Sequence, residues 1–134
     1  MVSGLLQGLR FGRLWWAIVV GLVALVVWLS LTPYPIDVGG PEGFDPGHFI
    51  AYAVMMFWFA QLLRPGRGRI AAAIALVALG VGLEFAQLLT SERHFDPADM
   101  RDDAIGVAAG FLLAMSPLGM ALQYLERRLA AVLG

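Results

Sequence analysis

Residues 83–110, LEFAQLLTSERHFDPADMRDDAIGVAAG, join two apolar segments through a short polar connection. Glu84 and Gln87 lie near the end of the first segment, and Asp99 and Asp103 lie at the start of the second. Charged groups at the edge of hydrocarbon are costly, so they are usually retained for a function or for pairing with one another. The stretch therefore predicts a pair of membrane helices with a polar site where they meet.

The composition of the whole chain fits a small membrane protein of one domain. Its 134 residues are 60% hydrophobic and 14% charged, with a mean hydropathy of +0.77. The charges are unevenly placed and leave apolar runs of membrane-spanning length. There is no cysteine, which excludes disulfides and thiolate chemistry, and every basic residue is arginine, which excludes lysine chemistry. The net charge of −1 and the lack of a basic stripe give no reason to expect nucleic acid as a partner.

The apolar runs and their breaks predict an all-α fold with four transmembrane helices in a single domain, residues 1–134. We expect these helices at residues 14–32, 46–63, 70–90 and 98–116. A short amphipathic lead before the first helix and an amphipathic tail over residues 118–133 are expected to flank them. Prolines and glycines separate the runs, because neither residue supports a helix interior.

The arginines predict the orientation of these helices. Seven of the nine precede the first helix, join the second to the third, or follow the fourth. Only Arg93 and Arg101 fall on the other side. By the positive-inside rule both termini are cytoplasmic and the two acidic loops face outward.

For several polar residues, an ordinary structural role is an alternative to a role in function. Asp45 and Asp96 each precede a proline, which is typical of an N-cap followed by the first helical position. Interhelical hydrogen bonding or interfacial anchoring is an alternative for His48 and Tyr52. Asp102 is expected to be solvated.

The acids within the predicted helices are harder to explain by structure alone. Glu84 needs a partner inside the bundle, such as Arg93 or His48, and a purely structural ion pair is one alternative. Asp99 and Asp103 are like charges four residues apart, which destabilise a helix unless Arg93, Arg101 or a metal ion relieves them.

Small residues predict where helices pack closely. Gly106 and Gly110 form a G-x-x-x-G pattern, and Gly80 shares a helix face with Glu84 and Gln87. Helices two, three and four can then direct side chains at one shallow outer pocket. The candidate ligand-binding residues are Asp45, His48, Tyr52, Glu84, Gln87, Arg93, Asp99 and Asp103. The candidate metal ligands are His48, Glu84, Asp99 and Asp103, and the candidate catalytic residues are Glu84, His48 and Asp99.

The ordered set of these motifs resembles the VanZ-like family of small bacterial membrane proteins over about residues 14–115. The motifs are Phe44-Asp45-x-x-His48-Phe49-x-x-Tyr52, Glu84-x-x-Gln87, Arg93-x-Phe95-Asp96-x-x-Asp99 and Gly106-x-x-x-Gly110. This chain has Pro46 where the family usually has lysine, and Asp103 where asparagine is usual. The resemblance implies a multi-pass protein of the bacterial cytoplasmic (inner) membrane with a link to glycopeptide, specifically teicoplanin, resistance.

Three functions are consistent with the sequence. The first is binding of a membrane lipid or lipid-linked envelope precursor at the outer face, with arginines contacting phosphate. The second is a metal-dependent intramembrane hydrolase or transferase acting on an envelope lipid, with a divalent ion as cofactor and Glu84 as general base. The third is a small proton-coupled transporter, which requires a homo-oligomer because each chain has few helices.

Overall fold

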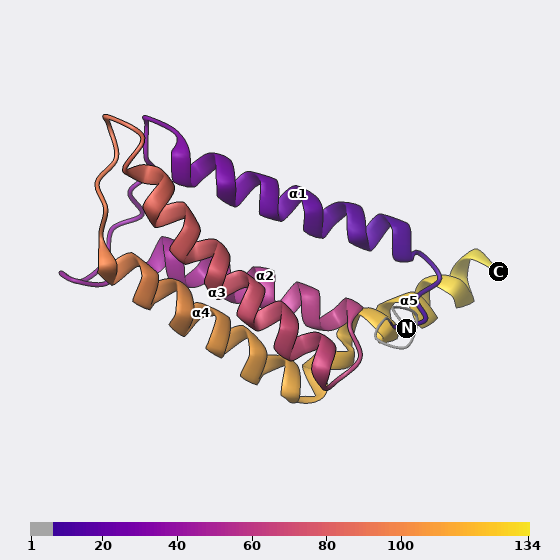
Figure 1. Ribbon diagram of the computed structural model, residues 1–134. Coiled ribbons are helices and arrows are strands. Elements are labelled where there is room, and N and C mark those ends of the chain that lie inside the picture. The colour runs from indigo at the N-terminus through magenta and orange to yellow at the C-terminus, as the bar shows by residue number, and fades with distance from the viewer. Residues whose placement is uncertain (1–6) are drawn as a thin grey trace.

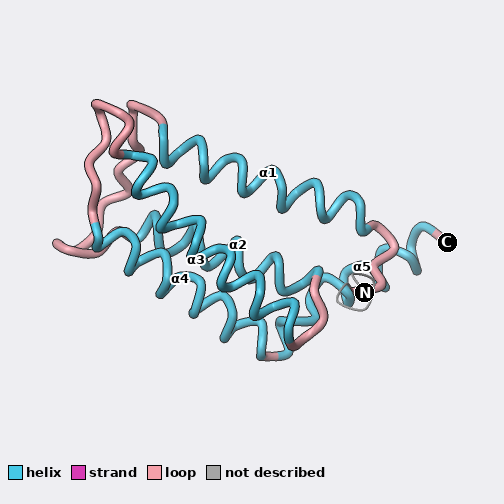
Figure 2. The backbone as a smooth tube through the Cα atoms, in the orientation of Figure 1, coloured by secondary structure: helices cyan, strands magenta, loops and turns pink. Residues whose placement is uncertain are grey.

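The computed structural model describes residues 7–134 and confirms an all-helical fold (Figures 1 and 2). No strand occurs in this part of the chain. The helices are α1 (Gly12–Leu31), α2 (Pro46–Leu62), α3 (Arg67–Gln87), α4 (Pro97–Met115), the short 3-10 helix η2 (Pro117–Met120) and α5 (Ala121–Leu133). Their bounds lie close to the predicted ones, and the predicted amphipathic tail is confirmed as α5.

The predicted helical lead before α1 is only partly covered by the structure. Residues 1–6 lie outside the described part of the chain. Residues 7–11 are not helical, so the expectation of a flanking helix is wrong for them. Their backbone instead bonds to other elements: the N–H of Gln7 donates to the carbonyl of Leu62 over 2.8 Å.

Two helices are long and apolar enough to cross a membrane, α1 with 20 residues and α3 with 21. A third crossing is available if α4 and the segment after it count as one bent span, since they meet at 79°. α2 has 17 residues, which is at the lower limit for a span. The structure thus agrees with a membrane protein that has two to three candidate spans.

The closest helix pair is α2 and α4, and the glycines of α4 make this approach possible. A Cβ built on Gly106 would lie 2.4 Å from the carbonyl oxygen of Phe49, and one on Gly110 would lie 2.4 Å from that of Ala53. No side chain fits at either position. The tight packing predicted from the G-x-x-x-G pattern is therefore confirmed, and the partner is α2.

Helix ends follow the local sequence signals. The side chain of Asp45 accepts the N–H groups of Gly47 and His48, and that of Asp96 accepts the N–H of Ala98. Both aspartates are N-caps with proline at the next position, as predicted. At the C-terminal ends of α2 and α4, the buried guanidinium of Arg69 donates to the carbonyl of Leu63, the C-cap of α2, and to that of Ala114 in the last turn of α4. A cation at helix C-termini is favourable.

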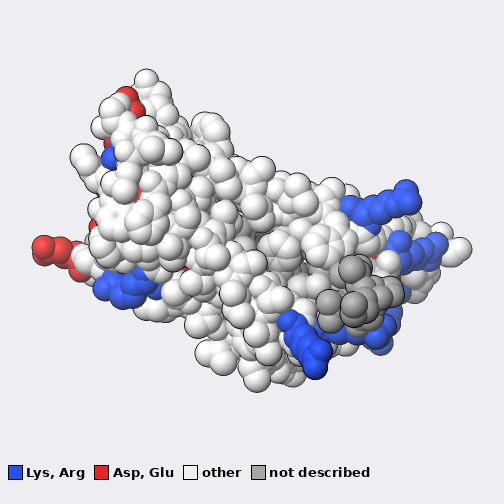
Figure 3. Space-filling view, viewed as in Figure 1, with Lys and Arg blue, Asp and Glu red and all other residues white. Residues whose placement is uncertain are grey.

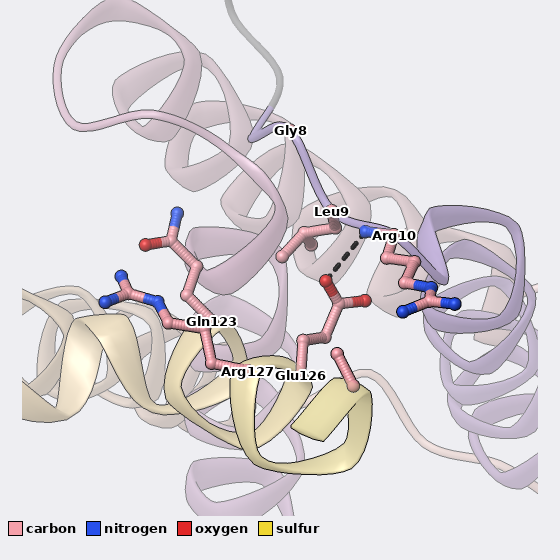
Figure 4. A pocket seen from close by; sticks show the side chains of 7 residues that line it. Gly8, Leu9, Arg10, Gln123, Glu126 and Arg127 are labelled. Atoms are coloured by element: carbon pink, nitrogen blue, oxygen red, sulfur yellow. Dashed lines mark hydrogen bonds between the residues drawn. The ribbon is translucent and has the colours of Figure 1, made fainter. Parts of the chain in front are cut away.

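A buried carboxylate fixes α5 to the start of α1 (Figure 4). Glu126 accepts the backbone N–H groups of Arg10 (2.7 Å) and Phe11 (2.8 Å) and the indole N–H of Trp15 (2.6 Å). Burial acts to raise the pKa of Glu126, but these three donors favour the charged form and lower the pKa below its usual value. The sequence reading did not single out this residue.

Gly110→Ala tests the contact between α2 and α4. The new methyl group meets the Ala53 carbonyl and, at 3.0 Å, the Cβ of Met56, so the helices must separate. We expect a lower melting temperature by circular dichroism in detergent, equivalent to about 1–3 kcal/mol. Gly82→Ala in α3 is the matched control, because nothing lies within 4 Å of its Cβ position. Its melting temperature should stay the same or rise, and equal losses in the two variants would contradict the packing account.

Glu126→Gln tests the anchor of α5. Because the folded-state pKa is lowered, Glu126 stabilises the anchored state above the unfolded pKa of about 4.3, and this contribution is lost as pH falls through the folded pKa. Hydrogen exchange of the Arg10 and Phe11 amides should therefore be slow near pH 7 and lose protection on acidification. The variant should show faster exchange already near pH 7. Unchanged protection in the variant would contradict the anchor.

Candidate functional site

The two ends of the molecule differ in charge (Figure 3). The acidic end comprises residues 32–45 and 88–96 with the adjoining ends of α1 to α4, and Figure 1 shows both connections on the same side of the bundle. Nine of the ten acidic residues belong to this end, whereas seven of the nine arginines belong to the opposite, basic end. All the residues predicted to bind a ligand lie at the acidic end.

His48, in the first turn of α2, is the centre of the polar cluster. Its Nδ1 lies 2.7 Å from Oδ1 of Asp103, which is buried on α4. A carboxylate in this position accepts a hydrogen bond from Nδ1–H, which fixes the orientation of the ring and leaves Nε2 to face the other way. The close packing of α2 and α4 brings these two residues together.

Two more carboxylates face Nε2 of His48. Oδ2 of Asp99 lies 3.5 Å away and Oδ2 of Asp45 lies 3.9 Å away. One ligand atom from each of Asp45, His48 and Asp99 fits within 4.8 Å of the others. The Asp45 side chain is 45% exposed, against 17% for His48 and 20% for Asp99, so the group opens to the surface at Asp45.

The two oxygens of Asp45 have different roles. Oδ1 accepts the N–H of Gly47 over 2.8 Å and that of His48 over 3.4 Å, and so caps α2. Oδ2 points toward His48 instead. The capping role and a ligand role are therefore compatible in one side chain.

Asp102 is a member of the site that the sequence reading missed. It was expected to be solvated, but it is only 1% exposed. Its Oδ2 accepts the backbone N–H of Asp45 over 2.8 Å, and its Oδ1 pairs with Arg101 over 2.7 Å. Arg101 also donates to the carbonyl of Gly43. Asp102 and Arg101 thus hold the residues before α2 against α4 and set the position of Asp45.

Helix α3 closes the inner side of the cluster. A Cβ at Gly80 would lie 2.6 Å from Oδ2 of Asp103, so the absence of a side chain there makes room for the carboxylate. Tyr52 is buried one helical turn below His48. Glu84 and Gln87, also on α3, are buried but serve other contacts.

Glu84 and Gln87 hold connecting segments in place. Oε2 of Glu84 accepts the backbone N–H of Asp96 over 3.0 Å, and the amide of Gln87 donates to the carbonyl of Ser30 over 2.8 Å. Neither of the partners suggested for Glu84, Arg93 and His48, forms an ion pair with it among residues 7–134. Within residues 7–134, neither Arg93 nor Arg101 forms a salt bridge with Asp99 or Asp103, and His48 lies against both acids instead.

The donor set has the chemistry of a divalent cation site. Two carboxylate oxygens and an imidazole nitrogen suit ions such as Mn²⁺ or Zn²⁺. A histidine ligand usually donates its second ring N–H to a carboxylate, which is the role that Asp103 has here. Of the predicted metal ligands, His48 and Asp99 belong to the set, Asp103 supports it, and Glu84 lies outside it.

The fold and this site together define a small helical protein with two to three helices long and apolar enough to span a membrane, and a histidine–carboxylate site at one end. Comparison of the chain with protein-family models, curated proteins and solved structures found no match. The motif residues quoted above are therefore the only basis for the resemblance to the VanZ-like family.

Proposed function

We propose that the protein binds a divalent cation through Asp45, His48 and Asp99 and, through that cation, the phosphate of a membrane lipid or lipid-linked envelope precursor. The observation that supports this proposal is the arrangement around His48. Asp103 bonds one ring nitrogen, and the other faces two carboxylates. The cluster carries more negative than positive charge, so its natural ligand is a cation rather than a bare phosphate.

Three protein ligands leave coordination positions for an external group. Divalent ions such as Mn²⁺ and Mg²⁺ prefer about six oxygen or nitrogen ligands and commonly bind substrate phosphates at open positions. The exposed side of Asp45 gives access from the surface. A phosphate at the ion then lies at the depth of lipid headgroups, if α1 to α4 cross the membrane.

We place the acidic end at the outer face of the bacterial cytoplasmic membrane, with α1 to α4 as four spans. The arginine-rich basic end then faces the cytoplasm by the positive-inside rule. α2 measures about 25 Å at 1.5 Å per residue, which suits a span in a locally thin bilayer. The resemblance to the VanZ-like family agrees with this location and, by similarity, connects the site to teicoplanin susceptibility.

A metal-dependent hydrolase or transferase acting on the same lipid is the second candidate. It is favoured by the same three-ligand set, because catalytic metal sites keep an open position for water or substrate. Glu84 is not placed to act as its general base, since it is 1% exposed and its carboxylate holds the Asp96 N–H. Turnover of a phosphate ester by the cation-loaded protein separates this function from binding alone.

Titration with Mn²⁺ tests the cation site. Binding is measured as the loss of the electron paramagnetic resonance signal of free Mn²⁺. We expect one strongly bound Mn²⁺ for each chain and at least tenfold weaker binding by Asp99→Asn, which removes a ligand. Asp103→Asn should weaken binding about 10- to 100-fold, because it loosens the orientation of His48. Glu92→Gln is the matched control, since Glu92 is an exposed acid at the same end outside the site.

The Glu92→Gln control distinguishes specific coordination by Asp45, His48 and Asp99 from nonspecific attraction of Mn²⁺ to the acidic end. Equal weakening in Glu92→Gln and Asp99→Asn, or no saturable Mn²⁺ binding, would contradict the proposal. The lipid step has its own measurement: a phosphate-bearing lipid that copurifies with the chain should be released by a chelator. Retention after chelation would overturn the cation bridge while leaving the cation site intact.

A further inference from the structure

The basic end presents an almost uniformly positive surface. Six arginines there are exposed, and the one acid, Glu126, is 7% exposed and bound by three N–H donors. Figure 3 shows basic side chains gathered at the end opposite the acidic loops. The exposed arginines are Arg10, Arg13, Arg64, Arg67, Arg127 and Arg128.

Helix α5 lies across this end rather than along the bundle. It follows α4 after a break at Ser116-Pro117, and the two segments meet at 79°. If α4 runs through a bilayer, α5 therefore lies close to the membrane plane. Figure 1 shows that α5 extends past the other helices toward the C-terminus.

The two sides of α5 differ in the way that an interfacial helix requires. Leu122, Leu125, Leu129 and Val132 recur at intervals of three and four residues and so share one side. Arg127 lies on the opposite side, and Arg128 lies at the border. Leu122 contacts the bundle and is 6% exposed, whereas Val132, beyond the bundle, is 83% exposed. The apolar side of α5 is therefore buried against the bundle at its start and exposed near the C-terminus.

The position of α5 is fixed by polar contacts. Oε1 of Gln61 accepts the N–H of Leu122 over 3.1 Å, and the Gln61 amide donates to the carbonyl of Leu118 over 3.0 Å. Glu126 then binds the residues that open α1. These contacts set the angle at which the exposed Leu125 and Val132 are presented relative to the bundle.

We propose that the basic end is a binding surface for anionic phospholipid, with the apolar side of α5 in the acyl region and Arg127 and Arg128 at the phosphates. Charge complementarity selects the partner, because the exposed charges of this end are all arginine. The long side chain of Arg128, at the border of the apolar side, can reach the headgroup level while its stem lies against the acyl region, and Arg127 on the opposite side faces the headgroups. This surface is independent of the cation site at the acidic end.

Spin labels at neighbouring positions test the placement of α5. The chain has no cysteine, so Val132→Cys and Ala131→Cys accept a nitroxide at one position only. In bilayers of phosphatidylcholine and phosphatidylglycerol, the label at 132 should be accessible to oxygen and protected from a water-soluble nickel complex. The label at 131, about 100° around the helix, should be accessible to the nickel complex. Nickel access at both positions, or protection from both agents at 132 as in a protein interface, would overturn the proposal.

Lipid titrations test the role of the arginines. Native mass spectrometry of the delipidated full chain should show preferential binding of phosphatidylglycerol over phosphatidylcholine. The double variant R127Q/R128Q should lose about 25-fold of its phosphatidylglycerol affinity, at roughly fivefold for each charge. R127K/R128K keeps the charges and should keep the preference. An unchanged preference in R127Q/R128Q would overturn the proposal.

Discussion

The close contact between α2 and α4 is the constraint on which the acidic end depends. Gly106 and Gly110 let the two backbones meet, with no room for a side chain between them. One turn before Gly106, the side chains of Asp102 and Asp103 are therefore level with the start of α2. A larger separation would remove the 2.7 Å contact of Asp103 with His48 and the 2.8 Å contact of Asp102 with the Asp45 N–H. Helix packing and the polar site are thus a single arrangement.

Buried carboxylates in so apolar a protein need compensation, and each one has a different donor. Glu84 binds a loop N–H, Asp102 binds a backbone N–H and an arginine, and Glu126 binds two N–H groups and an indole. These acids are satisfied by the protein. Around His48, by contrast, three carboxylates share one imidazole. The remaining negative charge is what distinguishes this cluster from the structural acids and supports a cation there.

Local signals were sufficient to predict α1 to α4, with ends within three residues of the observed ones. Proline after Asp45 and Asp96 indicates N-caps because the preference depends on neighbouring residues only. The G-x-x-x-G pattern likewise indicates a close helix contact, although it does not identify α2 as the partner. The predicted group of His48, Asp99 and Asp103 is brought together by the fold.

Contacts between distant residues account for what the sequence did not predict. Asp102 looked solvated because its partner, the Asp45 N–H, is 57 residues away. Glu126 looked like an ordinary charge of an amphipathic tail, since its acceptor role depends on N–H groups more than a hundred residues earlier. Charge alone suggests Arg93 or His48 as the partner of Glu84, but the backbone N–H of Asp96 satisfies Glu84 instead.

Nε2 of His48 is placed to bind a divalent cation together with Asp45 and Asp99, because Asp103 holds Nδ1. Nitrogen-15 NMR of the ring nitrogens, before and after addition of Zn²⁺, measures this directly. The chain has two histidines, so in the His94→Gln variant the only imidazole signals are those of His48. We expect Zn²⁺ to shift Nε2 to the range of a metal-bound nitrogen while Nδ1 keeps its proton. Ring signals that do not respond to Zn²⁺, or a response at Nδ1 in place of Nε2, would contradict the account.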